Sequence, residues 1–260
     1  MSESTIESGA SIQSKRILVT GGTSGMGQAI VEAFPDFGAQ VVFFGRNEDK
    51  GHALAEATGA TFYPVDVTDP SGVERGIDQA ADLLGGLDIL IHASGIAPGQ
   101  NAEDITLAQW NEVMTTNATG TFLTNVHVFP HLKEQGGVIL NFSSAGGIQG
   151  YAGKAHYAAS KGAVTAWVRS VAREWAPYNI RVNAIAPAIW TPMYDKTRAA
   201  MSPEQLARHD EMLKSAIPLG GKLGDVKQDF IPIMRFLSSD DARFMTGQVF
   251  AIDGGTLMLR

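Results

Sequence analysis

The stretch "RILVTGGTSGMGQAI", residues 16–30, is a short apolar run followed by a cluster of glycines and the start of a helical pattern. The apolar run predicts a buried strand, and the residues from Met26 to Phe37 predict a helix that ends near Gly38. Glycines at positions 21, 22, 25 and 27 allow a tight turn, let backbone N–H groups approach a pyrophosphate and let the helix pack closely. An ordinary strand-to-helix turn is the alternative, but the position after a first strand favours a dinucleotide-binding loop.

Six further apolar runs follow at intervals, separated by segments with a helical pattern. They lie at residues 41–44, 61–65, 87–92, 137–142, 180–185 and 248–252. Longer helices are expected at 109–133 and 155–175. Strands that alternate with helices need crossover connections and form parallel sheets. The pattern predicts a single α/β domain with a doubly wound, seven-stranded parallel sheet of the Rossmann type and helices on both faces.

The chain divides into a short tail and one large domain. Residues 1–14 are rich in serine and predict a disordered tail, whereas residues 15–260 form the predicted catalytic domain. Residues 191–225 insert a methionine-rich, helix-prone segment before the last strand. Because such an insertion lies over the carboxyl ends of the strands, we expect it to be a lid over the substrate.

Composition excludes several classes of function. The net charge is −7 with no basic block, which disfavours nucleic acid and anionic membranes as partners. The chain contains no cysteine, so disulfides, thiolate nucleophiles and iron–sulfur clusters are excluded. It shows no signal peptide and no apolar run near the roughly 18 residues that a membrane span needs. We therefore expect a cytoplasmic protein that acts on a small molecule.

The end of the second strand indicates which nicotinamide cofactor would bind. An acidic residue there would bind the ribose 2′-hydroxyl of NAD, whereas an arginine would accommodate the 2′-phosphate of NADP. The sequence has Gly45 followed by Arg46, which favours NADP, although Arg46 could instead be a solvated loop residue. Asp66, after the third strand, is expected beside the adenine or as the cap of a turn.

Tyr157 and Lys161 are four residues apart and share one face of a predicted helix. An ammonium beside a phenol stabilises the phenolate, so we expect Lys161 to lower the pKa of Tyr157 and make it an acid/base catalyst during hydride transfer. A serine hydroxyl at the end of the strand at 137–142, Ser143 or Ser144, could hold the substrate oxygen. Asn117 could bind backbone or support a proton relay to Lys161.

Taken in order, the motifs of this chain resemble those of the short-chain dehydrogenase/reductase family. The motifs are "TGGTSGMG", "DV" at 66–67, "TTNATG", "SS" with "YAASK", "NAIAP" with a following threonine, and "DGG" at 253–255. The resemblance runs from about residue 14 to the C-terminus. It implies an oxidoreductase acting on an alcohol or a ketone. The spacing of the family places the catalytic serine 13 positions before the tyrosine, which selects Ser144, and the asparagine 40 positions before it, which selects Asn117. Tyr151 and Lys154 do not fit this spacing and are expected in the pocket wall or on the surface.

The resemblance also implies the residues that bind the cofactor and the substrate. For the cofactor these are Gly21, Thr23, Ser24, Gly25, Met26, Gly27, Arg46, Asp66, Val67, Ala93, Gly95, Tyr157, Lys161, Pro187, Ile189 and Thr191. For the substrate pocket they are Ile96, Ser144, Ile148, Tyr151, His156, Trp190, Met193 and Tyr194. This set is apolar and aromatic, which indicates an apolar or cyclic substrate.

The sequence departs from the family pattern in two places. "HASG" puts His92 and Ala93 where the family has two asparagines that help to tie neighbouring strands together, which leaves the local hydrogen bonding open. "PAIWT" is one residue shorter than the usual loop and lacks its glycine, so Ile189 is expected to take over the backbone contact with the carboxamide.

His127 and His131, one helical turn apart, could describe a metal pair, but no acidic motif accompanies them and we predict no metal. A surface or subunit contact is the better interpretation. The resemblance implies a homotetramer, or a homodimer, built on the helices at 109–133 and 155–175 and on the C-terminus.

The sequence thus predicts an NADP(H)-dependent oxidoreductase that interconverts a secondary alcohol and a ketone. An NAD-dependent alcohol dehydrogenase of the same family is the alternative. A module that only senses dinucleotides would be expected to lose Tyr157 or Lys161, and a cofactor-free dehalogenase-like relative would lose the lysine and the glycine loop. All of these features are present.

Overall fold

A seven-stranded parallel sheet forms the centre of the molecule, in a computed structural model that describes residues 10–258 except for the side chains of Met193 and Lys196. The strand order is β3-β2-β1-β4-β5-β6-β7, and neighbouring strands run parallel. The strands are β1 Arg16–Thr20, β2 Gln40–Gly45, β3 Thr61–Pro64, β4 Ile89–His92, β5 Gly137–Phe142, β6 Ile180–Pro187 and β7 Val249–Ile252. The predicted fold class and all seven predicted strands are confirmed.

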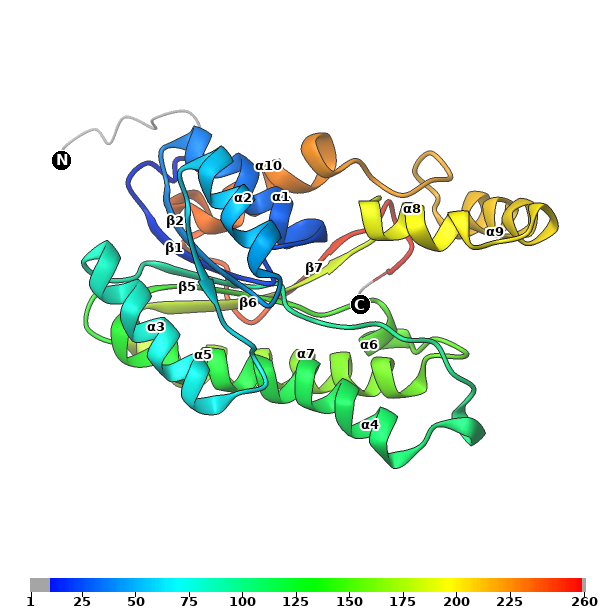
Figure 1. Ribbon diagram of the computed structural model, residues 1–260, viewed down its shortest axis with the longest axis horizontal. Helices are drawn as coiled ribbons and strands as arrows, with labels where there is room; N and C mark the ends of the chain where they lie inside the picture. Colours follow the sequence, from blue (N-terminus) through cyan, green and yellow to red (C-terminus); the bar gives the residue numbers. More distant parts are fainter. Residues whose placement is uncertain (1–9, 259–260) are drawn as a thin grey trace.

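Helices cover both faces of this sheet (Figure 1). One layer contains α1 Gly25–Ala33, α2 Glu48–Thr58 and α10 Ile231–Ser238, and the other contains α3 Pro70–Leu84, α4 Leu107–Met114, α5 Gly120–Leu132 and α7 Ala155–Trp175. Side chains of each strand alternate between the two layers, so Ile17 and Val19 pack in one buried cluster and Leu18 packs in the other. Both faces of the sheet are therefore dry, as a parallel sheet requires.

The predicted helix at 109–133 is divided by a π-helical turn. α4 continues through the π turn at Thr115–Thr119 into α5, and the buried Asn117 lies in that turn. Such a turn widens the helix locally and often marks a functional position. The helix predicted at 155–175 is confirmed by α7. The first helix, α1, ends at Ala33, before the predicted Phe37; a 3-10 turn at Pro35–Phe37 then leads into Gly38, which has a φ of 80° and ends the helical segment as predicted.

The predicted tail boundary at residue 14 is wrong for residues 10–14. Ile12 is only 1% exposed and belongs to the core, and the Ser14 N–H donates to the Gly38 carbonyl at 2.8 Å. The apolar Ile12 side chain fills the end of the layer that contains α1, because burying it removes apolar surface from water. The rest of the predicted tail, residues 1–9, lies outside the described residues.

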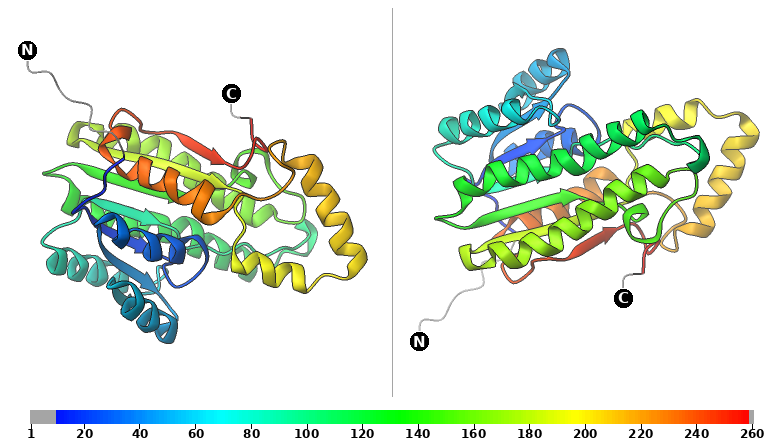
Figure 2. Two further views of the ribbon diagram at one scale, coloured as in Figure 1. Left: turned by 90° about the horizontal axis from the view of Figure 1, so that it is seen from above. Right: turned by 90° about the horizontal axis from the view of Figure 1, so that it is seen from below.

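The predicted lid extends beyond the carboxyl ends of the strands (Figure 2). It contains α8 Pro192–Ala199 and α9 Pro203–Ala216, and α9 begins with a capping box between Ser202 and Gln205. No residue of α9 is buried, unlike those of the helices that cover the sheet. Among the described residues, no helix combines the length and the apolar content needed to cross a membrane.

Candidate active site

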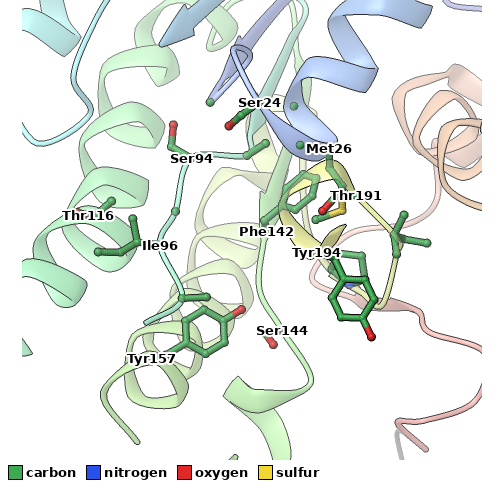
Figure 3. A pocket seen from close by; sticks show the side chains of 18 of the residues that line it. Ser24, Met26, Ser94, Ile96, Thr116, Phe142, Ser144, Tyr157, Thr191 and Tyr194 are labelled. Carbon is green, nitrogen blue, oxygen red and sulfur yellow. The ribbon is translucent and has the colours of Figure 1, made fainter. Parts of the chain in front are cut away.

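A cavity of about 1170 Å³ lies at the carboxyl ends of the strands, between the sheet and the lid. Most of the predicted cofactor and substrate residues line it, and Figure 3 shows side chains that converge there from separate elements. The predicted residues in its wall are Gly21, Thr23, Ser24, Gly25, Met26, Gly27, Arg46, Asp66, Val67, Ala93, Gly95, Ile96, Ser144, Tyr151, Tyr157, Lys161, Pro187, Ile189, Thr191 and Tyr194. Residues as far apart in the chain as Gly21 and Tyr194 therefore share one cavity.

The glycine loop forms one wall of the cavity. Gly21 has φ of 68°, and a Cβ there would lie 2.9 Å from the backbone nitrogen of Ser94. A Cβ at Gly27 would lie 2.4 Å from the Gly21 carbonyl oxygen, so no side chain fits at this position. α1 begins at Gly25 without a side-chain cap and without an acidic residue in its first turn. Its first N–H groups can thus hold a phosphate.

Arg46 lies at the end of β2, at the far end of the cavity from Tyr157, together with Asn47 and Lys50. Its guanidinium is 3.8 Å from the carboxylate of Asp66, and both side chains are partly exposed. Asp66 also accepts hydrogen bonds from the N–H and the hydroxyl of Thr68, so it caps the turn after β3 while it lines the cavity. Sequence reasoning missed Lys50 as a cavity residue. Its position four residues after Arg46, at the start of a helix, was the available signal.

The two neighbouring serines have different surroundings. The Ser143 hydroxyl is buried against Thr165, with 2.6 Å between the oxygens, and donates to the carbonyl of Lys161. The Ser144 hydroxyl accepts from the N–H of Gly146 at 3.1 Å and hydrogen-bonds with Tyr157. Only Ser144 is hydrogen-bonded to the phenol, which lies beside it in the cavity (Figure 3).

The expectation that Lys161 lowers the pKa of Tyr157 is wrong for this structure. Burial raises the pKa of Tyr157 above its usual value of 10, and the hydrogen bond from Ser144 offsets this only in part. The Lys161 ammonium instead donates to the Phe142 carbonyl at 2.6 Å. Complete burial lowers the pKa of Lys161 to about 8. Both side chains are therefore protonated at neutral pH.

Asn117 holds the chain segment around Ile96. Its side-chain oxygen accepts from the N–H of Ile96 at 2.8 Å, and its amide donates to the Ile96 carbonyl and to the Ser160 hydroxyl, both at 2.9 Å. A Cβ at Gly95 would lie 3.1 Å from the Asn117 oxygen and 3.3 Å from the Lys161 nitrogen. Asn117 thus binds backbone, as one of the sequence interpretations had it, and lies close to Lys161.

His92 ties neighbouring elements together in place of the usual asparagine. Its Nδ1 lies 3.0 Å from the hydroxyl of Thr20 on β1 and 2.9 Å from that of Thr124 on α5. The Thr20 hydroxyl in turn accepts from the N–H of Ser94, which lines the cavity. Burial and the charge of Lys161 lower the pKa of His92 to about 3, so the ring is neutral. Although "HASG" departs from the family pattern, the His92 side chain therefore still connects β4 with β1.

The shortened "PAIWT" loop is fastened to the end of the lid. The backbone N–H of Trp190 donates to the Gly224 carbonyl at 2.8 Å, and the backbone N–H of Gly224 donates to the Ala188 carbonyl at 3.0 Å. These bonds place Ile189 as a bridge partner of Gly224 and on the cavity wall. The two ends of the lid segment are thereby joined at its base.

Side-chain pairs connect the two helices of the lid. The Tyr194 hydroxyl lies 2.5 Å from Nε2 of His209, and the Arg198 guanidinium binds the Asp210 carboxylate through two bonds. Tyr194 and His209 both line the cavity, with Met212 of α9 and Leu223. Sequence reasoning missed His209, Met212 and Leu223 as cavity residues. The way in which the lid segment folds over the cavity leaves no local pattern in the sequence.

Three predicted pocket residues, Ile148, His156 and Trp190, are not among the described residues of the cavity wall. Ile148 is 37% exposed on α6 Gly146–Gln149, and His156 is 1% exposed and turned into the protein. Trp190 lies outside the wall because its indole packs against Tyr194 and donates to Asp195. The side chain of Met193 lies outside the described residues.

One histidine of the pair on α5, His131, joins two helices. His131 lies 2.9 Å from the carboxylate of Asp78 on α3, which joins two helices of the same layer. Within residues 10–258, no cluster of three or more histidine, aspartate or glutamate side chains is arranged to hold a metal ion.

Comparison with known proteins agrees with this geometry. Residues 21–256 match a protein family described as enoyl-(acyl carrier protein) reductase. The chain is 34% identical to L-fucose dehydrogenase of Mus musculus over 93% of this chain and 88% of that protein. It is 33% identical to trans-4-hydroxycyclohexanecarboxylate dehydrogenase of Sinomonas cyclohexanicum, over 94% and 93% of the two chains.

Solved structures show the same fold. The crystal structure of Cj0485 dehydrogenase superposes with a TM-score of 0.89 at 27% identity, over 97% of this chain and 98% of that chain. Fold, motifs and relatives agree along nearly the whole chain. The protein therefore belongs to the short-chain dehydrogenase/reductase family of oxidoreductases.

Proposed function

We propose that the protein is an NADP(H)-dependent oxidoreductase that interconverts a secondary alcohol and a ketone, with an apolar or cyclic substrate. One observation carries the proposal: a single cavity contains the glycine loop and Arg46 at one end and Ser144, Tyr157 and Lys161 at the other. Its volume of about 1170 Å³ exceeds the roughly 300–1,000 Å³ of most ligand pockets, which leaves room for a dinucleotide and a small substrate.

The geometry supports a role for each polar side chain. Ser144 holds the substrate oxygen, and Tyr157, kept protonated by burial, donates its proton to a ketone. Lys161, charged below its pKa of about 8, binds the nicotinamide ribose through its ammonium group. Asn117 supports the return of the proton through Lys161. A bound nicotinamide would supply or accept the hydride.

Two cations, Arg46 directly after β2 and Lys50 in α2, support NADP as the cofactor. Arg46 and Lys50 both line the cavity there, and a 2′-phosphate would bind between charged donors of this kind. The contact between Arg46 and Asp66 supports the alternative, NAD, because a carboxylate near the adenine ribose can accept from a free 2′-hydroxyl.

The walls around Tyr157 support an apolar or cyclic substrate. The residues that line the cavity with Tyr157 include Ile96, Tyr151, Tyr194, Met212 and Leu223. The two enzymes compared above are named for compounds with ring forms, a cyclohexane acid and a sugar. A ring-bearing secondary alcohol or its ketone is the substrate class that we propose.

The test is a rate assay of the purified protein with NADPH or NADH and a panel of cyclic ketones and small polyols. We expect reduction of cyclic ketones with a preference for NADPH. Equal rates on polyols would contradict the substrate class, and equal use of NADH would favour the alternative cofactor. A Tyr157→Phe variant that binds NADPH and has lost turnover would exclude a module that only senses the dinucleotide.

We also propose a homotetramer. Trp110 on α4 and Phe122 on α5 are 39% and 43% exposed, and these aromatic side chains support a contact between subunits on the helical layer that contains α7. Sedimentation of the full chain tests the proposal, and a monomer at micromolar concentration would contradict it.

A further inference from the structure

Lys154 places a second ammonium group at the substrate end of the cavity. Its nitrogen lies 5.8 Å from the centre of the Tyr157 ring, and both residues line the cavity. The ammonium donates to the Ala97 carbonyl at 3.3 Å. An ammonium has three N–H donors, and within residues 10–258 no carboxylate pairs with this one. Lys154 therefore has donors and a full charge to offer to a ligand.

The backbone around Lys154 is held by two chain segments. Lys154 is the residue immediately before α7, and its N–H donates to the Tyr151 carbonyl at 3.2 Å. It forms a short parallel bridge with Gln100, whose N–H donates to the Gly153 carbonyl at 2.7 Å. These backbone bonds fix the Cα position of Lys154. The fold therefore holds the lysine beside Tyr157.

The charges around Tyr157 are cationic and are not balanced within the wall. Lys154 and Lys161 line the cavity with Tyr157, whereas Asp66, the one carboxylate among the described lining residues, lies after β3 beside Arg46. The nearby Asp253 is not in the lining, and its carboxylate accepts from two N–H groups of its own turn. A neutral substrate would cover the Lys154 ammonium without a counter-charge, which is unfavourable.

We infer that the substrate carries a carboxylate, which Lys154 binds while Tyr157 acts on a hydroxyl or keto group elsewhere in the same molecule. This inference rests on the proposed function and names its substrate class as a hydroxy acid and the corresponding oxo acid. Lys154 is a specificity-determining residue in this reaction. The proton and the hydride move at the alcohol carbon, so the carboxylate takes no part in the chemistry.

The test compares matched acids and esters. Reduction of 4-oxocyclohexanecarboxylate, its methyl ester and cyclohexanone is measured with NADPH and with NADH for the wild type and for Lys154→Ala, Lys154→Arg and Lys222→Ala. We expect the wild type to prefer the acid over the ester, and Lys154→Ala to lower kcat/KM for the acid about 10- to 100-fold, the value of a hydrogen bond to a charged group. The ester should change less than about threefold, Lys154→Arg should keep part of the preference, and Lys222→Ala, an exposed lysine outside the wall, should keep all of it.

A binding measurement separates recognition from catalysis. Competitive inhibition by cyclohexanecarboxylate should weaken in Lys154→Ala, whereas inhibition by cyclohexanecarboxamide should not. The inference is overturned if the wild type prefers the ester, or if Lys154→Ala lowers the rates on acid and ester equally, because Lys154 would then act through Tyr157. If cyclohexanone and the ester are reduced but the acid is not, the inference alone fails. If no ketone is reduced with either cofactor, the proposed function fails with it.

Discussion

The carboxyl edge of the sheet and the lid form facing walls of one cavity, but they are held in different ways. At the sheet edge, Lys161, Asn117 and Ser144 are buried, and each is hydrogen-bonded to backbone. The lid helices are connected by side-chain pairs, such as that between Arg198 and Asp210, and α9 has no buried residue.

We expect this difference to separate a rigid wall, which would carry the chemistry, from a lid that can move. Buried groups with backbone partners keep their positions, which acid/base catalysis requires. Exposed side-chain pairs contribute little stability, so the lid can open and its residues can change without loss of the fold. Substitutions at the two walls should therefore have different kinetic signatures.

The largest effect is expected at the sheet edge, in Tyr157→Phe. Loss of the acid/base group should lower kcat at least about 100-fold. The Kd for NADPH, measured by fluorescence titration, should stay within about threefold, since the ring and its packing remain. Tyr178→Phe, an exposed tyrosine outside the cavity, serves as the control. Unchanged turnover in Tyr157→Phe would remove this residue from the mechanism.

Arg46→Asp tests the far end of the same wall. The substitution removes a charged donor and adds a charge that repels a 2′-phosphate, so kcat/KM for NADPH should fall by about 10- to 100-fold relative to NADH. Arg75→Ala, on the exposed face of α3, should leave the ratio of the two cofactors unchanged. The same ratio in Arg46→Asp would show that the guanidinium does not contact the cofactor.

His92 tests the interior of the sheet edge through pH. Its pKa of about 3 lies below the usual value of about 6.5, so between these values the unfolded chain takes up a proton that the folded chain excludes. The free energy of unfolding should therefore fall as the pH drops from 6.5 toward 3, by up to about 1.4 kcal/mol per pH unit from this group. Urea denaturation at several pH values should show a shallower dependence for His92→Asn than for the wild type. An identical dependence would mean that His92 is protonated in the folded protein.

The smallest effect is expected in the lid, in Asp210→Asn, which weakens the pair with Arg198. The KM for the substrate should rise roughly two- to fivefold because the pair is near the surface, with kcat and the Kd for NADPH little changed. Limited proteolysis should cut between α8 and α9 faster than in the wild type. A loss of kcat as large as that in Tyr157→Phe would contradict the division between the two walls.

Much of the fold was predictable because its signals are local. Seven apolar runs predicted seven strands, and Gly38 predicted the end of the first helical segment. The π-helical turn around Asn117 was not predicted, because the hydrogen bonds of this buried side chain join it to Ile96, in a separate segment of the chain. The packing of Ile12 was missed for the same reason, since its partners lie in distant segments.

The sequence alone determined the parallel sheet, the phosphate loop and the shared helical face of Tyr157 and Lys161, because periods of two and 3.6 residues and the freedom of glycine are properties of neighbouring residues. Only the tertiary structure decided that burial raises the pKa of Tyr157, that His92 binds Thr20 and Thr124, and that Lys154 lines the cavity with no carboxylate paired to it in residues 10–258. Burial and pairing of charges depend on which distant segments the fold brings together, and no local pattern records them.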